Sequence, residues 1–450
     1  MVPLASSIEA AGLRRATVEA KRAAFLAATR ALRGQTGESS VDGAFVVPGR
    51  IEVLGKHTDY AGGRSLLCAA EQGFCVVVRA RSDAAVHVID VASGESIETA
   101  LDPALEPVRG HWGHYPATVA RRVARNFPGA RLGADIALSS DLPRASGMSS
   151  SSALMIAAFL AIAHVNHLAQ DPSFQSAIAS SEDLAGYLAT IENGNGFGTL
   201  AGDVGVGTFG GSEDHTAILC CRPDALSQYR FAPVQPEREI EWPAGMSFVI
   251  AVSGVVAEKT GAALGRYNRA SRSAARVLEA WRHATGRSDP TLGRAIRDSP
   301  DGLAQMRAVL ASAGDQDFSA AMLRDRFEQF RVESEEIIPA ASAALAAGDL
   351  PRFGVLVDQS QDAAERWLGN QIAETMWLAR HARECGAAAA SAFGAGFGGS
   401  VWAMVPAEQV AAVIERWSTA YRAAYPEAGA RSAFFETRPG PSARQIERAN

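Results

Sequence analysis

The pattern of apolar and polar residues predicts a helix and then a mostly β region in the first part of the chain. Residues 7–33 mix Ala, Leu and Arg at helical spacing and end at Gly34, which is typical of an amphipathic helix. Apolar, β-branched runs follow, and each of them predicts a strand. These runs are AFVVPGRIEVLG (44–55), VVVRARS (76–82) and VHVIDVA (86–92).

The pattern then alternates between helix and strand, and it becomes mainly helical in the second half. Residues 114–127 have helical periodicity, and 133–143 form a predicted strand that leads into a glycine-containing loop. The serine-rich, apolar stretch 149–169 predicts a buried helix whose beginning is too polar to span a membrane. Further strands are predicted at 246–254 and 400–405.

Length, charge and cysteine content narrow the class of protein. A chain of 450 residues exceeds the size of a single core, so we expect two domains, at 1–235 and 236–450, divided in the polar segment 222–243. A net charge of −6 without a basic cluster gives no reason to expect a nucleic-acid or membrane partner and favours small-molecule chemistry. Five cysteines without a CxxC spacing, and no targeting segment, suggest a reducing, cytoplasmic location.

A polar cluster follows the first predicted strand, in the motif PGRIEVLGKHTDYAGG from Pro48 to Gly63. Crowded polar side chains after a strand suit a binding site. A solvated turn is the alternative, because His and Asp are common turn residues. The cluster consists of Arg50, Lys56, His57, Asp59 and Tyr60.

Two glycine-containing motifs suggest close approach of the backbone to another group. In LPRASGMSSSSALMIA, from Leu142 to Ala157, Gly147 and the serines stand where a strand gives way to a helix, so free amides would face an anion such as phosphate. A serine-rich helix cap is the alternative, and a Walker-type loop is excluded because GxxxxGK[ST] does not occur. SAFGAGFGGSVWAMV, from Ser391 to Val405, offers glycines either for close approach or for tight turns.

In this order the three motifs resemble those of the galactokinase family, which read PGRxNxxGEHTDYxxG, GLSSSA and GGGFGG. The resemblance extends to WGHY (112–115), RYNRASR (266–272) and GDLPRFGVLV (348–357), and so covers most of the chain. It implies an α+β, two-domain GHMP kinase fold. The N-terminal domain would be ribosomal-protein-S5-domain-2-like, the C-terminal domain a ferredoxin-like α/β sandwich, and the active site would lie in the cleft between them.

The resemblance also implies catalytic residues. GSEDH (211–215) resembles the GIMDQ segment that carries the family's general base, so Asp214 would accept the proton of the sugar's anomeric hydroxyl. His215 departs from the family's Gln. Arg50 would keep Asp214 ionised and stabilise the transferred phosphoryl group. The alternative partner for Arg50 is Glu52, two residues along the same strand face, and both pairings are compatible.

ATP and magnesium are the implied cofactors. Trp112 resembles the tryptophan that flanks adenine in the family, with ordinary core packing as the alternative. A serine of the loop and a helical glutamate would bind the metal, which prefers few protein oxygens. The candidates are Ser150 or Ser151, because four consecutive serines leave the register open by one, together with Glu192. The implied ATP-binding set is Trp112, Gly147, Met148, Ser149, Ser150, Ser151 and Ser152.

The implied activity is that of an ATP-dependent sugar 1-kinase of galactose metabolism, acting as a monomer or weak dimer on galactose or a related aldose. The expected substrate-binding residues are Lys56, His57, Asp59, Tyr60 and Tyr267. Lys56 replaces a glutamate that would contact the sugar's 6-hydroxyl, so a hexuronic acid such as galacturonate is an alternative substrate. Equally, Lys56 could pair with Glu52, which replaces the family's Asn. A non-catalytic sugar and ATP sensor is the alternative of another class.

Overall fold

The larger of two β-sheets is built from the N-terminal half of the chain and its C-terminal end. The computed structural model describes residues 5–10, 12–37, 40–143, 146–256 and 261–446. Within them, nine strands form a sheet in the order β13-β1-β2-β5-β3-β4, with β6 and β12 paired to other stretches of β2, and β7 paired to β6. All pairs are antiparallel except β3 with β5. The strands are β1 (Gly43–Leu54), β2 (Arg64–Ala80), β3 (Ala85–Asp90), β4 (Ser96–Ala100), β5 (Ala134–Ser140), β6 (Ala225–Arg230), β7 (Gln235–Glu241), β12 (Pro439–Gly440) and β13 (Arg444–Gln445).

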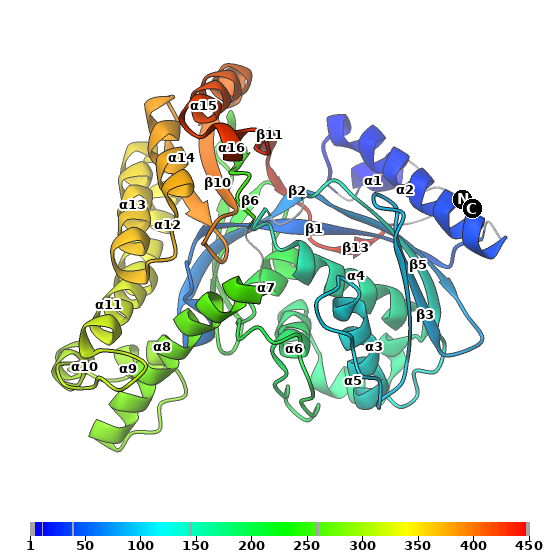
Figure 1. The fold of residues 1–450 in the computed structure, drawn as a ribbon, viewed down its shortest axis with the longest axis horizontal. Helices are drawn as coiled ribbons and strands as arrows, with labels where there is room; N and C mark the ends of the chain where they lie inside the picture. The colour runs from blue at the N-terminus through cyan, green and yellow to red at the C-terminus, as the bar shows by residue number, and fades with distance from the viewer. Residues whose placement is uncertain (1–4, 11, 38–39, 144–145, 257–260, 447–450) are drawn as a thin grey trace.

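Both faces of this sheet are covered, which explains why β1 is apolar without interruption. Successive side chains of a strand point to opposite faces, so Phe45 and Val47 enter the main core while Ala44 and Val46 enter a second core under α2. Figure 1 shows α2 on one side of the sheet and α3 and α4 on the other.

The first helix differs from its prediction over residues 7–33. It is divided into α1 (Ala5–Ala10) and α2 (Arg15–Thr36), and Gly12 between them has a φ of 91°, a left-handed conformation that a helix cannot contain. In α2, Val18, Phe25 and Leu32 recur at heptad spacing and are buried against the sheet.

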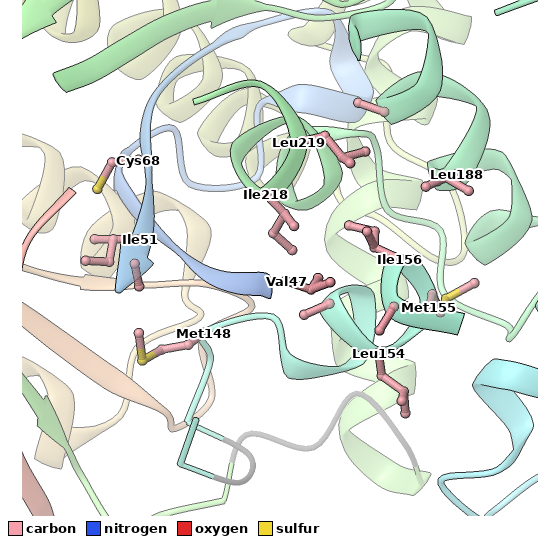
Figure 2. Packing of buried hydrophobic residues seen from close by; sticks show 14 of the residues in the cluster. Val47, Ile51, Cys68, Met148, Leu154, Met155, Ile156, Leu188, Ile218 and Leu219 are labelled. Carbon is pink, nitrogen blue, oxygen red and sulfur yellow. The ribbon is translucent and has the colours of Figure 1, made fainter. Parts of the chain in front are cut away.

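Helices on the other face hold the serine-rich segment in the core. α4 is apolar on nearly all sides because it is enclosed by β1, β2, α3 and α7. Figure 2 shows Val47 of β1, Ile156 of α4 and Ile218 of α7 in one cluster. The helical segments of this part are η1 (Asp59–Ala61), α3 (His114–Asn126), α4 (Ser150–Val165), η2 (Leu168–Gln170), α5 (Pro172–Ala177), α6 (Ser181–Asn193) and α7 (Glu213–Cys220).

The second part of the chain forms a four-stranded antiparallel sheet, ordered β11-β8-β10-β9, with helices packed on it. Its strands are β8 (Met246–Val252), β9 (Ala389–Phe393), β10 (Ser400–Pro406) and β11 (Ala433–Thr437). Its helical segments are α8 (Gly261–Thr285), α9 (Leu292–Arg297), α10 (Gly302–Leu310), α11 (Ala320–Arg331), the π-helical η3 (Val332–Ile337), α12 (Ile338–Ala346), α13 (Leu350–Ala363), the π-helical η4 (Ala364–Leu368), α14 (Ala373–Glu384), η5 (Ala407–Gln409), α15 (Val410–Ala424) and α16 (Pro426–Gly429). None of the described helices combines the length and the apolar character that a membrane crossing needs.

The chain passes from the first sheet to the second after the β6-β7 hairpin. Segment 222–243, interpreted as the boundary, contains the β6-β7 hairpin, which belongs to the first sheet through β2. The chain also returns to that sheet at its end, in β12 and β13. The division between residues 235 and 236 stays a prediction.

Candidate active site

A single guanidinium group joins three segments that are far apart in the sequence. Arg50 on β1 is 3 % exposed, and its Nε donates a hydrogen bond to Asp214 Oδ1 at 2.7 Å. Its Nη1 donates to the Gly147 carbonyl oxygen, also at 2.7 Å. The arginine of the first motif, the serine loop and the predicted base therefore meet at one point.

Local structure explains why these groups meet. The pairing of β1 with β2 shifts register between Pro48 and Arg50, and such irregularities re-aim side chains. Asp214 lies in the first turn of α7, where the helix dipole favours a negative charge. Gly147 has a φ of 75° just before α4, a conformation suited to glycine.

The third motif closes on the serine loop from the second domain. A Cβ added to Gly394 would lie 2.8 Å from the Gly147 carbonyl oxygen, so this approach requires glycine. Ser400 Oγ, at the start of β10, donates to the Ser146 carbonyl oxygen at 2.5 Å. The glycines of this motif therefore permit contact between the two domains. This contact agrees with close backbone approach, one of the two interpretations of the motif.

A pocket opens beside Arg50 and is lined by residues of both domains. Seven of the predicted site residues line it: Arg50, His57, Asp59, Tyr60, Glu192, Asp214 and Tyr267. Its other lining residues are Glu52, Gly210, Gly211, Glu213, His215, Gly394 and Ala395. Lys56, Trp112 and residues 147–152 are not part of this lining.

The turn that follows β1 is held rigidly in the pocket wall. His57 Nδ1 and Tyr60 Oη are 2.9 Å apart, and the Tyr267 ring lies 5.3 Å from the His57 ring, centroid to centroid. Burial raises the pKa of Tyr60 to about 12, so its hydroxyl keeps its proton at neutral pH. Arg326 of α11 donates to the His57 carbonyl oxygen and to Tyr60 Oη. Asp59 Oδ2 accepts from the Glu213 amide at 3.1 Å.

The serine that faces the acidic groups is Ser152. Its Oγ donates to Glu192 Oε2 at 3.0 Å and lies 3.4 Å from Asp214 Oδ2. Ser150 and Ser151 are half-buried at the beginning of α4. Within the described residues no group of three or more His, Cys, Asp or Glu is arranged to hold a metal. The Ser152 hydroxyl and the Glu192 carboxylate fit magnesium, a hard cation that keeps water and phosphate ligands.

Burial and neighbouring charges shift the pKa values of the ionisable groups of the pocket, in opposite directions for Arg50 and Glu52 and in the same direction for Glu213. Burial alone would lower the pKa of Arg50, but Asp214, Glu52 and Glu213 together raise it above its usual range. Burial raises the pKa of Glu52 to about 7, although Arg50 and Lys56 oppose this rise. The pKa of Glu213 lies well above its ordinary value, first through burial and then through the charges of Glu52 and Asp59.

Trp112 lies away from this pocket. It is half-buried in the turn before α3, and its Nε1 donates to Glu95 Oε2 at 2.9 Å. Its ring also packs against the main core. A role beside adenine therefore stays a prediction.

Lys56 points into a buried network between the domains. Its Nζ donates to Ser391 Oγ at 2.8 Å and to Ser360 Oγ at 3.1 Å, and the residue is 1 % exposed. Ser360 Oγ in turn donates to Glu333 Oε1 at 3.0 Å. The positive charge of Lys56 also acts on Glu52 and partly offsets the rise in the pKa of Glu52. The side chain ties the first motif to α13 and β9.

We expect Lys56→Glu to destabilise the protein without changing its preference between neutral sugars and hexuronates. The new carboxylate would be buried close to Glu333, which is fully buried itself, and such an uncompensated charge costs roughly 3–5 kcal/mol. Differential scanning calorimetry should show a marked fall in Tm for Lys56→Glu and a smaller one for Lys56→Met, which removes the charge but fills the space. An unchanged Tm together with a switched sugar preference would contradict this placement.

Two residues of the site were not singled out by the sequence. Glu213 directly precedes Asp214 in the sequence. The only feature that marks it is that it replaces the methionine of GIMDQ. Asn268 accepts a hydrogen bond from the Phe209 amide at 3.0 Å and donates to the Gly207 carbonyl oxygen at 2.9 Å. It follows Tyr267 in RYNRASR, so that motif holds the loop before α7 as well as the pocket wall.

Comparisons with known proteins agree with this architecture. Residues 33–80 match the family model of the galactokinase galactose-binding signature, 114–211 that of the GHMP kinases N terminal domain, and 341–423 that of the GHMP kinases C terminal domain. The structure of Lactococcus lactis galactokinase complexed with galactose superimposes with a TM-score of 0.73 at 22 % identity, covering 92 % of this chain and 98 % of that one. A mevalonate kinase superimposes with a TM-score of 0.53 at 12 % identity, covering 89 % of this chain and 99 % of that one.

Sequence relatives narrow the class further. The galactokinase of Actinobacillus pleuropneumoniae is 35 % identical over 129 residues, which is 29 % of this chain and 33 % of that protein. The galactokinase of Chloroflexus aggregans is 27 % identical over 372 residues, covering 81 % of this chain and 84 % of that protein. Fold and site thus define a GHMP kinase, α+β with two domains as the sequence predicts. Within that superfamily, the chain belongs to the galactokinase family.

Proposed function

We propose that this protein is an ATP-dependent sugar kinase of the galactokinase type, which phosphorylates the anomeric hydroxyl of galactose or a related aldose. The observation that carries the proposal is the position of Arg50, bonded at once to Asp214 and to the Gly147 carbonyl oxygen of the serine loop. A general base and a loop that can bind phosphate, both in contact with one cation, suit phosphoryl transfer, which depends on positioning and charge stabilisation.

In the proposed reaction Asp214 accepts the proton of the anomeric hydroxyl, and Arg50 stabilises charge on the phosphoryl group. The side chains of His57, Asp59, Tyr60 and Tyr267 would orient the sugar. They line the same pocket as Asp214.

The ATP phosphates would lie along the amides of residues 147–152 at the beginning of α4, where the helix end attracts anions. The adenine would lie against Trp112. Ser152 and Glu192 would hold magnesium, because their oxygens are 3.0 Å apart. Bound there, the metal would neutralise phosphate charge. Ser152 replaces Ser150 and Ser151 as the preferred metal ligand, since its hydroxyl faces Glu192.

The two alternative functions are less well supported. A hexuronate kinase would need Lys56 in the pocket, whereas its Nζ bonds to Ser360 and Ser391. A non-catalytic sensor would not need a base and an arginine in contact. We also propose a cytoplasmic location and a monomer or weak dimer, on the grounds of composition and family alone.

A coupled ADP-release assay tests the proposed function. The purified chain with ATP and magnesium should release ADP with galactose above the sugar-free background, and galacturonate, glucuronate and arabinose serve as comparison sugars. A sensor would bind sugar, as measured by calorimetry, without releasing ADP. Binding without turnover for every sugar of the panel would therefore rule out the kinase.

A further inference from the structure

The turn between β1 and β2, with the first residue of β2, is bonded along its backbone by side chains of the second domain. These side chains come from α9, α11 and the π-helical η3, whereas β1 and β2 belong to the first sheet. The bonded pairs, with the residue of the turn or of β2 first, are Gly55 with Glu333, Lys56 with Gln329, His57 with Arg326, Gly62 with Arg297 and Arg64 with Ser334. Buried backbone groups need such partners, so the shape of the turn depends on the second domain as well as on its own sequence.

His57 makes this support from outside the turn necessary. Its φ is 59°, a left-handed conformation that is uncommon for residues other than glycine and persists where the surrounding structure enforces it. The His57 carbonyl oxygen accepts from Arg326 Nη2, and the His57 Nε2 atom lies 3.1 Å from the Ala395 carbonyl oxygen. The conformation that places His57 in the pocket lining is therefore fixed by other segments of the chain.

Arg326 bonds to several parts of the pocket wall without lining the pocket itself. Besides the His57 carbonyl oxygen, its Nη2 donates to Tyr60 Oη at 3.2 Å. Its Nε donates at 3.4 Å to the carbonyl oxygen of Ala270, which follows Tyr267 on α8. Arg326 is 3 % exposed and does not belong to the pocket lining. It can therefore act on a bound sugar only through these neighbours.

The guanidinium group of Arg326 is itself held in one orientation. Its Nη1 donates to Gln329 Oε1, and Gln329 Nε2 donates in turn to the Lys56 carbonyl oxygen. Among the described residues its hydrogen-bond acceptors are carbonyl oxygens, an amide oxygen and a phenol, all of them uncharged. Arg326 thus contributes directed hydrogen bonds from a planar group rather than the neutralisation of a charge.

We propose that Arg326 is a positioning residue for the sugar, which sets the orientation of His57 and Tyr60 and thereby the affinity of the pocket. The proposal rests on the sugar-kinase function given above, since that function assigns the sugar to this pocket. Polar groups of a binding site bind well only when the residues behind them hold them in the binding geometry. The hydrogen bonds of Arg326 do not reach the serine loop, so we expect ATP binding to be independent of it.

The experiment measures sugar binding and ATP use separately. Calorimetry without ATP gives Kd for the aldose of the panel that binds most tightly, expected to be galactose, and the ADP-release assay gives KM for this sugar and for ATP. Arg326→Met fills the space but removes the donors. We expect Kd and KM for the sugar to rise about tenfold or more, and KM for ATP to stay within about twofold of its value in the unmodified chain.

Arg326→Lys keeps the charge but replaces the planar group by a single nitrogen, so it should recover only part of the affinity. This variant decides the question if Arg326→Met does not fold. An unchanged Kd for the sugar in Arg326→Met, or in Arg326→Lys where the first variant is unfolded, would overturn the proposal.

Arg297→Met is the matched control. Arg297 also donates to the turn, to the Gly62 carbonyl oxygen at 3.1 Å, and it pairs with Glu335 at 2.8 Å, but Gly62 does not line the pocket. The control should lower Tm and leave Kd for the sugar unchanged. If both arginine variants weakened sugar binding in proportion to their loss of Tm, Arg326 would have a structural role alone.

These results separate the two proposals. Sugar binding that weakens in Arg326→Met, without ADP release from the unmodified chain, would refute the kinase function and support the positioning role. ADP release together with unchanged sugar affinity in the Arg326 variants would support the kinase and refute the positioning role. Failure of the unmodified chain to bind any sugar of the panel would overturn both.

Discussion

Asp214→Asn is expected to lower kcat by about 10³-fold while the protein remains folded, because a positioned general base contributes roughly 10²–10⁴-fold. Asparagine keeps an oxygen that can accept the hydrogen bond from Arg50 Nε, now 2.7 Å from Asp214 Oδ1. It cannot take up the proton of the anomeric hydroxyl. The measurement is kcat at saturating galactose and ATP, with Tm recorded on the same preparation.

Asp325→Asn is the matched control, since Asp325 is exposed on α11 and the substitution is chemically identical. The control should retain full activity. If Asp214→Asn kept more than a tenth of kcat with an unchanged Tm, another group would have to be the base.

Arg50→Ala is expected to damage both stability and activity. Arg50 is the cation that balances Glu52, Glu213 and Asp214, and removing one partner of a buried ion pair costs roughly 3–5 kcal/mol. The loss of a cation beside the transferred phosphoryl group should lower kcat/KM by about 10²–10³-fold in addition. Calorimetry and the ADP-release assay measure the two effects.

The stability loss of Arg50→Ala should depend on pH in a defined direction. The pKa of Glu52 is raised to about 7 even with Arg50 present, so the folded state binds a proton that the unfolded chain has already lost. The Glu52 carboxyl is therefore less costly at pH 5, where it is protonated, than at pH 8. The Tm deficit should be larger at pH 8.

Two further variants sharpen the Arg50 result. Arg50→Lys keeps the charge but cannot donate to Asp214 and Gly147 with two separate nitrogens in the same geometry, so it should recover stability more than activity. Arg324→Ala, at an exposed position of α11, is the matched control and should behave as the unmodified chain. If Arg50→Ala, like the control, had the Tm of the unmodified chain at both pH values, Arg50 would not balance the three carboxyls.

The predicted elements correspond closely to those of the structure where hydrophobic periodicity is strong. Helices predicted at 114–127 and 149–169 correspond to α3 and α4, and the strands at 246–254 and 400–405 to β8 and β10. The hairpin within 222–243 escaped prediction, because β7 is largely exposed and lacks apolar alternation.

The motifs do not encode the directions in which the side chains of the site point. The four serines are equivalent as letters, and only the helical phase of α4 turns Ser152 toward Glu192. Lys56 stands in a motif full of pocket residues, yet its side chain enters the network with Ser360 and Ser391. Its partners lie 304 and 335 residues later in the chain, which local pattern cannot reveal.

The sequence by itself determined the family, the kinds of chemical group at the site and most of the helices and strands, because these depend on local periodicity and on ordered motifs. The tertiary structure decided which of those groups meet. Arg50, Gly147 and Asp214 touch only when β1, the serine loop and α7 pack together. Whether a buried charge faces the pocket or an interdomain network is fixed by long-range packing, since the energy of a charge depends on its surroundings rather than on its place in the chain.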